Sequence, residues 1–89
     1  MPNWKRIRQI ANKYNLFVIE DSADTLGATI NGKSSGIYSD ISITSFYGSH
    51  VISCAGNGGM LLTNNSKFYN KAKILRSWGR MSSLIKDSE

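Results

Sequence analysis

The sequence has little of what would identify several common classes of protein. Its 89 residues include a single cysteine, Cys54, which excludes an internal disulfide framework and a cysteine-based zinc site. Cys54 lies among small and apolar residues, so we expect a buried structural thiol. No apolar run approaches the length that spans a membrane, and the polar, basic N-terminus lacks the apolar stretch of a signal peptide. These absences favour a cytoplasmic protein without membrane contact.

Acidic residues are also scarce. Six Asp and Glu stand against 11 Lys and Arg, which gives a net charge of +5. Such a chain could bind nucleic acid. The positive charges are spread over two helix-like segments, however, which is typical of solvated helix faces. We therefore expect no nucleic-acid partner, although a small basic binding module stays open and would lose its affinity as salt rises.

The apolar pattern predicts one small α/β unit with no repeat, linker or second domain. A helix is expected over residues 2–14, where Pro2 suits a first helical position and apolar side chains recur at helical spacing. Residues 16–19 form a continuous apolar run, which is typical of a buried parallel strand. The run stops at Glu20 and Asp21, so both carboxylates should lie at the strand's carboxyl end, where open α/β sheets bind ligands.

Further strands and a second helix are expected after residue 30. Asn31-Gly32 is a strong turn signal between two short extended pieces. Strands are expected over 40–47 and 59–63, and residues 64–66 supply turn and N-cap chemistry. A helix should then cover 66–78. Its expected apolar face is Phe68, Ala72, Ile74 and Leu75, and its expected solvated face is Lys67, Lys71, Lys73 and Arg76.

Several polar residues could carry chemistry, and each also has an ordinary interpretation. Asp21 could be a cap or loop carboxylate, Asp24 a solvated turn residue, and Ser45 one more serine of a strand. His50, the single histidine, could be a packing or surface residue. The glycine-rich turn over 56–59 is a weak motif, because it lacks the Lys-Ser/Thr ending of a nucleotide-binding loop.

Taken together, the runs 19–24, 45–50 and 56–60 resemble the sugar-nucleotide branch of the pyridoxal-phosphate aminotransferases, the DegT/DnrJ/StrS family. The resemblance implies an α/β fold, a three-layer α/β/α fragment of an aspartate-aminotransferase-like large domain of the type I class. Members are several times longer and add a C-terminal domain and a phosphate-binding loop that this sequence lacks. Residues 1–89 are therefore expected to be one partial domain, either a fragment or a truncated reading frame.

The resemblance also implies a role for each polar residue. Asp21 matches the aspartate that keeps the cofactor's ring nitrogen protonated, which deepens the ring's capacity to accept electrons. Asp24 matches a position beside the ring, and Ser45 matches a serine that binds the cofactor phosphate. His50 stands where the family normally has the lysine that holds the cofactor covalently. Histidine cannot form that bond, but with a reference pKa of about 6.5 it can take up a proton at neutral pH.

A histidine at this position, with an aspartate at position 24, is typical of the family's 3-dehydratases. The implied cofactor is pyridoxamine 5'-phosphate, related to pyridoxal 5'-phosphate and held noncovalently. The implied reaction removes the 3-hydroxyl of a nucleotide-linked 4-keto-6-deoxyhexose, supplying deoxysugars for lipopolysaccharide and similar polymers. The expected partners are a nucleotide-sugar substrate and, at full length, a second identical subunit.

Two departures from the family pattern refine this interpretation. Related iron–sulfur members carry cluster cysteines beside positions 22–23 and 81–83, which here are Ser-Ala and Met-Ser-Ser. We therefore expect no metal and favour the cluster-free dehydratases of the colitose pathway. Asn57 stands where the family often has glutamate, and it is left without a role. A sugar aminotransferase that tolerates the missing lysine and a noncatalytic remnant remain alternatives.

Overall fold

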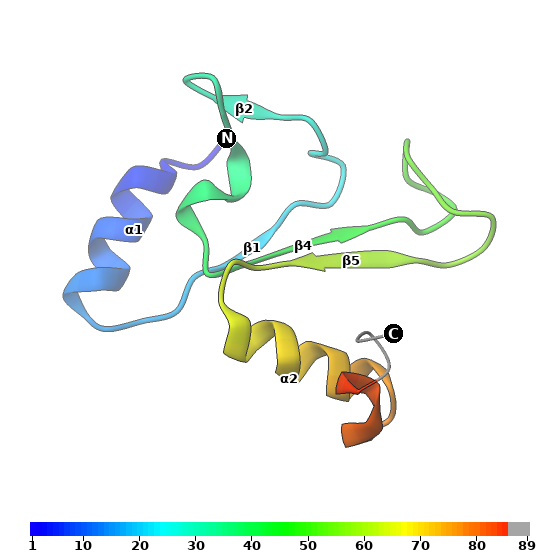
Figure 1. The fold of residues 1–89 in the computed structure, drawn as a ribbon. Helices are drawn as coiled ribbons and strands as arrows, with labels where there is room; N and C mark the ends of the chain where they lie inside the picture. The colour runs from blue at the N-terminus through cyan, green and yellow to red at the C-terminus, as the bar shows by residue number, and fades with distance from the viewer. Residues whose placement is uncertain (86–89) are drawn as a thin grey trace.

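The computed structural model describes residues 1–85, which form a small mixed α/β unit (Figure 1). The stretch 81–89, for which the sequence predicts no element, lies partly outside the described residues. The elements, in chain order, are α1 (Trp4–Lys13), β1 (Ile19–Asp21), β2 (Thr29–Ile30), β3 (Lys33–Ser34), the 3-10 helix η1 (Ser35–Tyr38), β4 (Ile41–Ser45), β5 (Gly59–Leu62), α2 (Ser66–Arg76) and the 3-10 helix η2 (Met81–Leu84). The predicted α/β class is confirmed.

A three-stranded sheet of order β1-β4-β5 forms the centre of the unit. β1 runs parallel to β4, with Glu20 opposite Ser42, and β4 runs antiparallel to β5. The predicted hairpin is also present. β2 pairs with β3 across Asn31 and Gly32, whose φ values of 52° and 73° suit the tight turn that joins two antiparallel strands.

The prediction for the first strand was wrong in its bounds. The strand covers Ile19–Asp21 rather than 16–19, and the side chains of Leu16 and Phe17 are exposed. Leu16 still belongs to the helix end, because its N–H donates to the carbonyl of Ala11 at 2.8 Å. Glu20 and Asp21 consequently lie within the strand and not beyond it.

The sheet has two faces because side chains alternate along each strand. One face carries Glu20 and Ser42, and η1 lies over it, since a Cβ on Gly36 would sit 3.4 Å from the Cβ of Ser42. α2 approaches the sheet from a different side, below the strands in Figure 1, while η1 and the hairpin lie above them. Its Phe68 ring packs edge-on against Phe17, with the centroids 5.2 Å apart. In Figure 1, η1 and α2 thus lie on different sides of the strands.

Both helices begin at asparagine caps. The side chain of Asn3 accepts a hydrogen bond from the N–H of Arg6, and Asn65 accepts from Lys67 and Phe68. The cap predicted within 64–66 is confirmed.

The predicted faces of α2 were wrong at two positions. Lys73, expected in solvent, is 8% exposed, and its ammonium lies 5.5 Å from the ring centroid of Tyr69. η2 folds back onto this side, where the hydroxyl of Ser83 donates to the carbonyl of Lys73. Leu75, expected to be buried, is 63% exposed. A long aliphatic stem lets a lysine take a packed position that helical spacing assigns to solvent.

The described residues bury little apolar surface. Only Ala11 and Val18 are buried apolar side chains, whereas Ile19, Ile43 and Leu61 on the sheet are 64%, 39% and 44% exposed. Exposed apolar area of this kind is typical of interaction surfaces and ligand-binding grooves. Among residues 1–85, no helix has the length and apolar character needed to cross a membrane.

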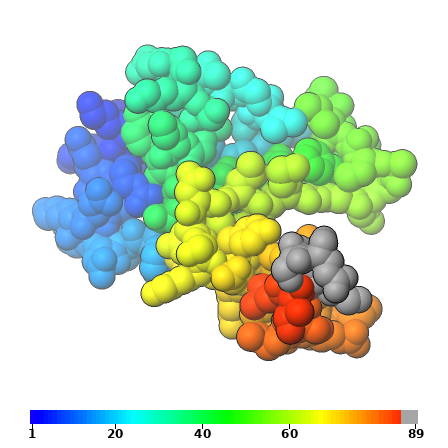
Figure 2. Space-filling view, viewed as in Figure 1, coloured from blue at the N-terminus to red at the C-terminus, as the bar shows by residue number. Residues whose placement is uncertain are grey.

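The segment between β4 and β5 projects away from the rest of the unit, at the right of Figure 2. Cys54 lies in this segment and is exposed, so the prediction of a buried thiol was wrong. The apolar composition around Cys54 did not produce burial, because no described element packs over the projecting loop.

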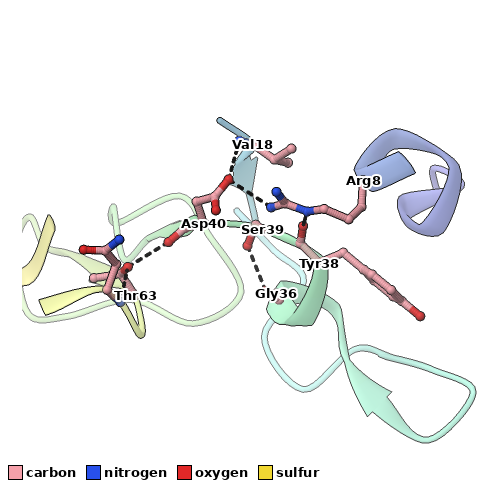
Figure 3. A network of polar contacts seen from close by, with 8 residues as sticks. Arg8, Val18, Gly36, Tyr38, Ser39, Asp40 and Thr63 are labelled. Atoms are coloured by element: carbon pink, nitrogen blue, oxygen red, sulfur yellow. Dashed lines mark hydrogen bonds and ion pairs between the residues drawn. The ribbon is translucent and has the colours of Figure 1, made fainter. Parts of the chain in front are cut away.

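An ion pair joins α1 to the strands (Figure 3). The guanidinium of Arg8 donates to the carbonyl of Tyr38 at 2.6 Å and to Oδ2 of Asp40 at 2.9 Å. Oδ2 of Asp40 also accepts from the N–H of Val18 at 2.8 Å. The hydroxyl of Thr63 donates to the carbonyl of Asp40 at 2.7 Å. Asp40 therefore links α1, the start of β1 and the end of β5.

Removing this ion pair should loosen the start of β1. In the complete polypeptide that carries this segment, Arg8→Met should speed hydrogen exchange at Val18 about fivefold, since partly exposed charged hydrogen bonds contribute about 1 kcal/mol. Arg6→Met is the matched control, because Arg6 donates only a long bond of 3.4 Å to Gln9 in addition to its capped N–H. Equal exchange in the two variants, measured by mass spectrometry, would contradict a structural role for Arg8.

The same network predicts a dependence on pH. The N–H of Val18 and then the guanidinium of Arg8 lower the pKa of Asp40, against the opposing effect of burial. Because the folded pKa is lowered, the stabilisation is present above the unfolded pKa of about 3.9 and is lost as pH falls through the folded value. The faster exchange of Arg8→Met relative to the parent should therefore disappear as pH falls through the lowered pKa of Asp40.

Candidate functional site

Two of the predicted site residues lie at the carboxyl edge of the sheet. Asp21 ends β1 and pairs in register with Ile43, and Ser45 ends β4 two residues further on. Alternation therefore places Asp21 and Ser45 on the same sheet face. One oxygen of Asp21 accepts from the N–H of Ala23 at 3.0 Å, and the hydroxyl of Ser45 accepts from the N–H of Tyr47 at 3.2 Å. Both side chains are held by the turns that follow their strands.

Asp24 lies in the turn after β1, and this turn is tied to β4. The carbonyl of Ser22 accepts from the N–H and the hydroxyl of Thr25, at 3.1 and 3.0 Å, and from the hydroxyl of Thr44 at 3.2 Å. Asp24 itself has a φ of +60°, in the left-handed region that few non-glycine residues adopt. The turn thus presents the carboxylate of Asp24 beyond the sheet edge.

His50 reaches Asp24 from the loop after β4. Its backbone N–H donates to the carbonyl of Tyr47 at 3.0 Å, and the two rings meet edge-on with centroids 6.4 Å apart. The Nδ1 atom of His50 lies 2.9 Å from each carboxylate oxygen of Asp24. The side chain of His50 is 23% exposed and that of Asp24 is 52% exposed. The structure therefore brings together two predicted site residues that are 26 positions apart in the sequence.

One residue of each pair, Ser45 and Asp24, borders a small cavity. A cavity of about 160 Å³ lies at the sheet edge and is lined by Asp24 and Ser45, together with Leu26, Thr44, Phe46, Val51 and Ile52. Ligand sites are usually larger, about 300–1,000 Å³. A larger cleft of about 640 Å³ borders Ser42 and the hairpin, but Asp21, Ser45 and His50 do not line it. We therefore place the candidate site at the sheet edge, around these residues, and not in the larger cleft.

The glycine-rich turn lets the loop that follows Ser45 pack closely against the end of β4. The N–H of Phe46 donates to the carbonyl of Gly58 at 2.8 Å, and the sulfur of Cys54 lies against Gly58 where a Cβ would stand. A Cβ on Gly59 would sit 3.1 Å from the carbonyl oxygen of Thr44. Glycine therefore allows the returning chain to pass close to the end of β4.

Sequence reasoning missed the separate environment of Glu20. Its side chain is 2% exposed, accepts from the hydroxyl of Ser22 at 2.8 Å, and faces away from Asp21. The hydroxyl of Ser22 also lies 2.8 Å from that of Ser42. Strand alternation was the available signal, because neighbouring residues of a strand point to opposite faces. Among residues 1–85, no three His, Cys, Asp or Glu side chains cluster as a metal site requires.

Known proteins resemble the chain over most of its length. Lipopolysaccharide biosynthesis protein RfbH of Salmonella typhimurium is 41% identical over 78 residues, covering 88% of this chain and 18% of the relative. dTDP-4-dehydro-2,6-dideoxy-D-glucose 3-dehydratase of Saccharopolyspora spinosa is 38% identical over 74 residues, covering 83% of this chain and 16% of the relative. The chain thus spans less than a fifth of the length of these two proteins.

Solved structures agree with these relatives. An aminotransferase from Psychrobacter cryohalolentis superposes with a TM-score of 0.84 at 31% identity, over 97% of this chain and 22% of its own. NtdA from Bacillus subtilis, solved with bound cofactor PMP, superposes with a TM-score of 0.75 at 34% identity, over 83% and 16%. Residues 1–87 also match a family model as a whole. The chain therefore belongs to the DegT/DnrJ/EryC1/StrS aminotransferase family.

Proposed function

We propose that these residues form part of the cofactor domain of a nucleotide-sugar 3-dehydratase that uses pyridoxamine 5'-phosphate. The substrate would be a nucleotide-linked 4-keto-6-deoxyhexose that loses its 3-hydroxyl. The observation that carries the proposal is His50. By resemblance it stands at the position of the family's cofactor lysine, and in the structure it contacts Asp24 at the carboxyl edge of the sheet. The named 3-dehydratase among the relatives supports the same assignment.

The residues at this edge fit a pyridoxal-type cofactor. Asp21 is exposed and uses one oxygen for Ala23, while its other oxygen makes no hydrogen bond among residues 1–85. An unengaged carboxylate oxygen suits a protonated ring nitrogen. The hydroxyl of Ser45, on the same face, can donate to a phosphate while it accepts from Tyr47.

The chemistry divides between the cofactor and the chain. The bound cofactor would supply an amine that condenses with the sugar's keto group and a ring that accepts electrons. Asp21 would hold the ring nitrogen protonated, and Ser45 would fix the phosphate. His50 would act as the base that takes a proton from the methylene carbon bearing the cofactor's amine as the 3-hydroxyl leaves.

A longer polypeptide is part of the proposal. Ile19, Ile43 and Leu61 expose apolar surface on the sheet, and the cavity at the site is smaller than a usual ligand pocket. The relatives are more than five times the length of the matched segment. Further domain surface, and a second identical subunit, would cover these side chains and close the site. The proposal also places the enzyme in the cytoplasm, because its substrate would be a nucleotide sugar.

The reaction itself is the first test. The complete polypeptide that carries this segment, incubated with pyridoxamine phosphate and a nucleotide-linked 4-keto-6-deoxyhexose, should yield a sugar that lacks the 3-hydroxyl. Mass spectrometry of the sugar product measures this loss. Residues 1–89 alone should give no turnover, because reacting groups need a complete surrounding shell to be positioned. Turnover by the short chain would contradict the proposal that it forms only part of a site.

An aminotransferase of the same family is the second candidate. The TM-score of 0.84 with the Psychrobacter aminotransferase favours it. With pyridoxal phosphate, glutamate and the same sugar, this candidate predicts a 4-amino sugar and no loss of the 3-hydroxyl. A noncatalytic remnant predicts neither product. The basic binding module predicts salt-dependent affinity for nucleic acid instead.

A further inference from the structure

We propose that Asp24 is a positioning residue that fixes the tautomer of His50, so that Nε2 is the atom that takes up the proton. The inference rests on the proposed function, because it specifies how the base of that reaction is prepared. The resemblance gave Asp24 a place beside the cofactor ring, and that role stays a prediction. The role proposed here is a separate one, and it is inferred from the contact that the two loops create between Asp24 and His50.

The contact itself is specific to Nδ1. That nitrogen lies 2.9 Å from both oxygens of Asp24, within the range of a charge-assisted hydrogen bond. A carboxylate only accepts, so Nδ1 must carry the hydrogen. In the neutral imidazole, Nε2 is then the unprotonated nitrogen with a free lone pair.

The backbone around Asp24 indicates that this geometry is built into the fold. A φ of +60° at a non-glycine residue costs of order 1 kcal/mol and persists where surrounding contacts hold it. Here the hydroxyls of Thr25 and Thr44 converge on the carbonyl of Ser22 and fix the turn. On the other side, the Tyr47–His50 turn fixes the imidazole, with the edge of the ring against Tyr47. Each member of the pair is therefore oriented by its own loop before any ligand binds.

The arrangement has a clear consequence for proton transfer. When Nε2 takes up a proton from the methylene carbon that bears the bound cofactor's amine, the imidazole ring becomes an imidazolium whose charge faces the carboxylate of Asp24. The proton on Nε2 then combines with the departing 3-hydroxyl as water, which returns His50 to its neutral form. Asp24 keeps its negative charge throughout and never receives the proton. Without this contact, His50 would carry its hydrogen on Nε2 in part of the molecules. Those molecules would present an N–H to the substrate and could not act as the base.

The tautomer can be measured without any reaction. His50 is the one histidine of this segment, and in the complete polypeptide its ¹⁵N resonances are assigned by their loss in His50→Gln. The ¹⁵N shifts of the cofactor-free protein should show hydrogen on Nδ1 in the parent. Asp24→Asn should shift the population toward hydrogen on Nε2, because an amide can also present an N–H to Nδ1. Asparagine tolerates a positive φ, so the turn should be kept.

Two further variants separate this role from a structural one. Asp24→Gly also tolerates the backbone and removes the carboxylate, so it should change the tautomer in the same direction. Glu20→Gln removes a carboxylate that lies buried against Ser22 and does not contact His50, so it should leave the tautomer of His50 as in the parent. An unchanged tautomer in both Asp24 variants would overturn the proposal, whatever reaction the protein catalyses.

Kinetics supply the second readout. Asp24→Asn should lower kcat for dehydration about 100-fold or more with little change in KM, the pattern of a misoriented catalytic imidazole. A tautomer change with unaltered kcat would also overturn the positioning role. If the parent shows no dehydration at all, the proposed function fails, while the ¹⁵N measurement still decides whether Asp24 fixes His50.

Discussion

The His50→Lys variant of the complete polypeptide is expected to hold pyridoxal phosphate through a covalent bond that the parent cannot form. Lysine restores a primary amine at the position where the family normally carries one, and amines condense with the aldehyde of this cofactor. The variant should turn yellow with the cofactor, and borohydride should fix the cofactor permanently on residue 50. Mass spectrometry of the digested protein locates the modified peptide. Dehydration should fall about 10²–10⁴-fold, the usual contribution of a positioned base.

A lysine placed one residue away is the matched control for this experiment. Ser49 precedes His50 in the same turn and is exposed, so Ser49→Lys should acquire no borohydride-stable cofactor. The parent should release the cofactor on dialysis and carry no adduct. A packing histidine remote from the cofactor predicts an unmodified peptide in both lysine variants. That result would remove the central support for the proposed function.

The second large effect concerns the carboxylate at the end of β1. Asp21→Asn should lower kcat about 10²–10³-fold, the range seen when one preorganised electrostatic contact is lost. The amide keeps an oxygen for the N–H of Ala23 but supplies no negative charge to a protonated ring nitrogen. KM for the sugar should change little, because the missing interaction acts on the chemical step.

The neighbouring carboxyl provides the comparison for Asp21. Glu20 lies on the opposite sheet face, buried against Ser22, so Glu20→Gln should leave the absorbance spectrum of the bound cofactor unchanged. Asp21→Asn should alter that spectrum, because the absorbance of the cofactor depends on whether its ring nitrogen is protonated. Equal spectra and near-parental turnover in Asp21→Asn would show that Asp21 does not contact the ring nitrogen.

Local chemistry made much of the fold predictable. Asn31-Gly32 predicted the β2–β3 hairpin, because these residues tolerate the positive φ values of 52° and 73° that its turn requires. The cap at Asn65 and the strands β4 and β5 followed equally from short sequence patterns. Such features depend on a few consecutive residues, and those residues are visible in the sequence.

Predictions failed where burial depends on distant parts of the chain. Composition alone suggested that Leu16, Phe17 and Cys54 would be buried, yet all three are exposed. Lys73 is buried because η2 returns over it. Whether an apolar side chain is covered depends on which surfaces meet in three dimensions, and a local pattern does not contain that information.

The sequence by itself determined the α/β class, the family resemblance and the identity of the candidate residues Asp21, Asp24, Ser45 and His50. Only the tertiary structure decided how these residues are combined. The parallel register of β1 and β4 sets Asp21 and Ser45 on one face and turns Glu20 to the other. The two turns bring Nδ1 of His50 to 2.9 Å from Asp24 across 26 positions of sequence. A hydrogen bond needs distance and direction between two atoms, and for residues so far apart only the folded backbone supplies both.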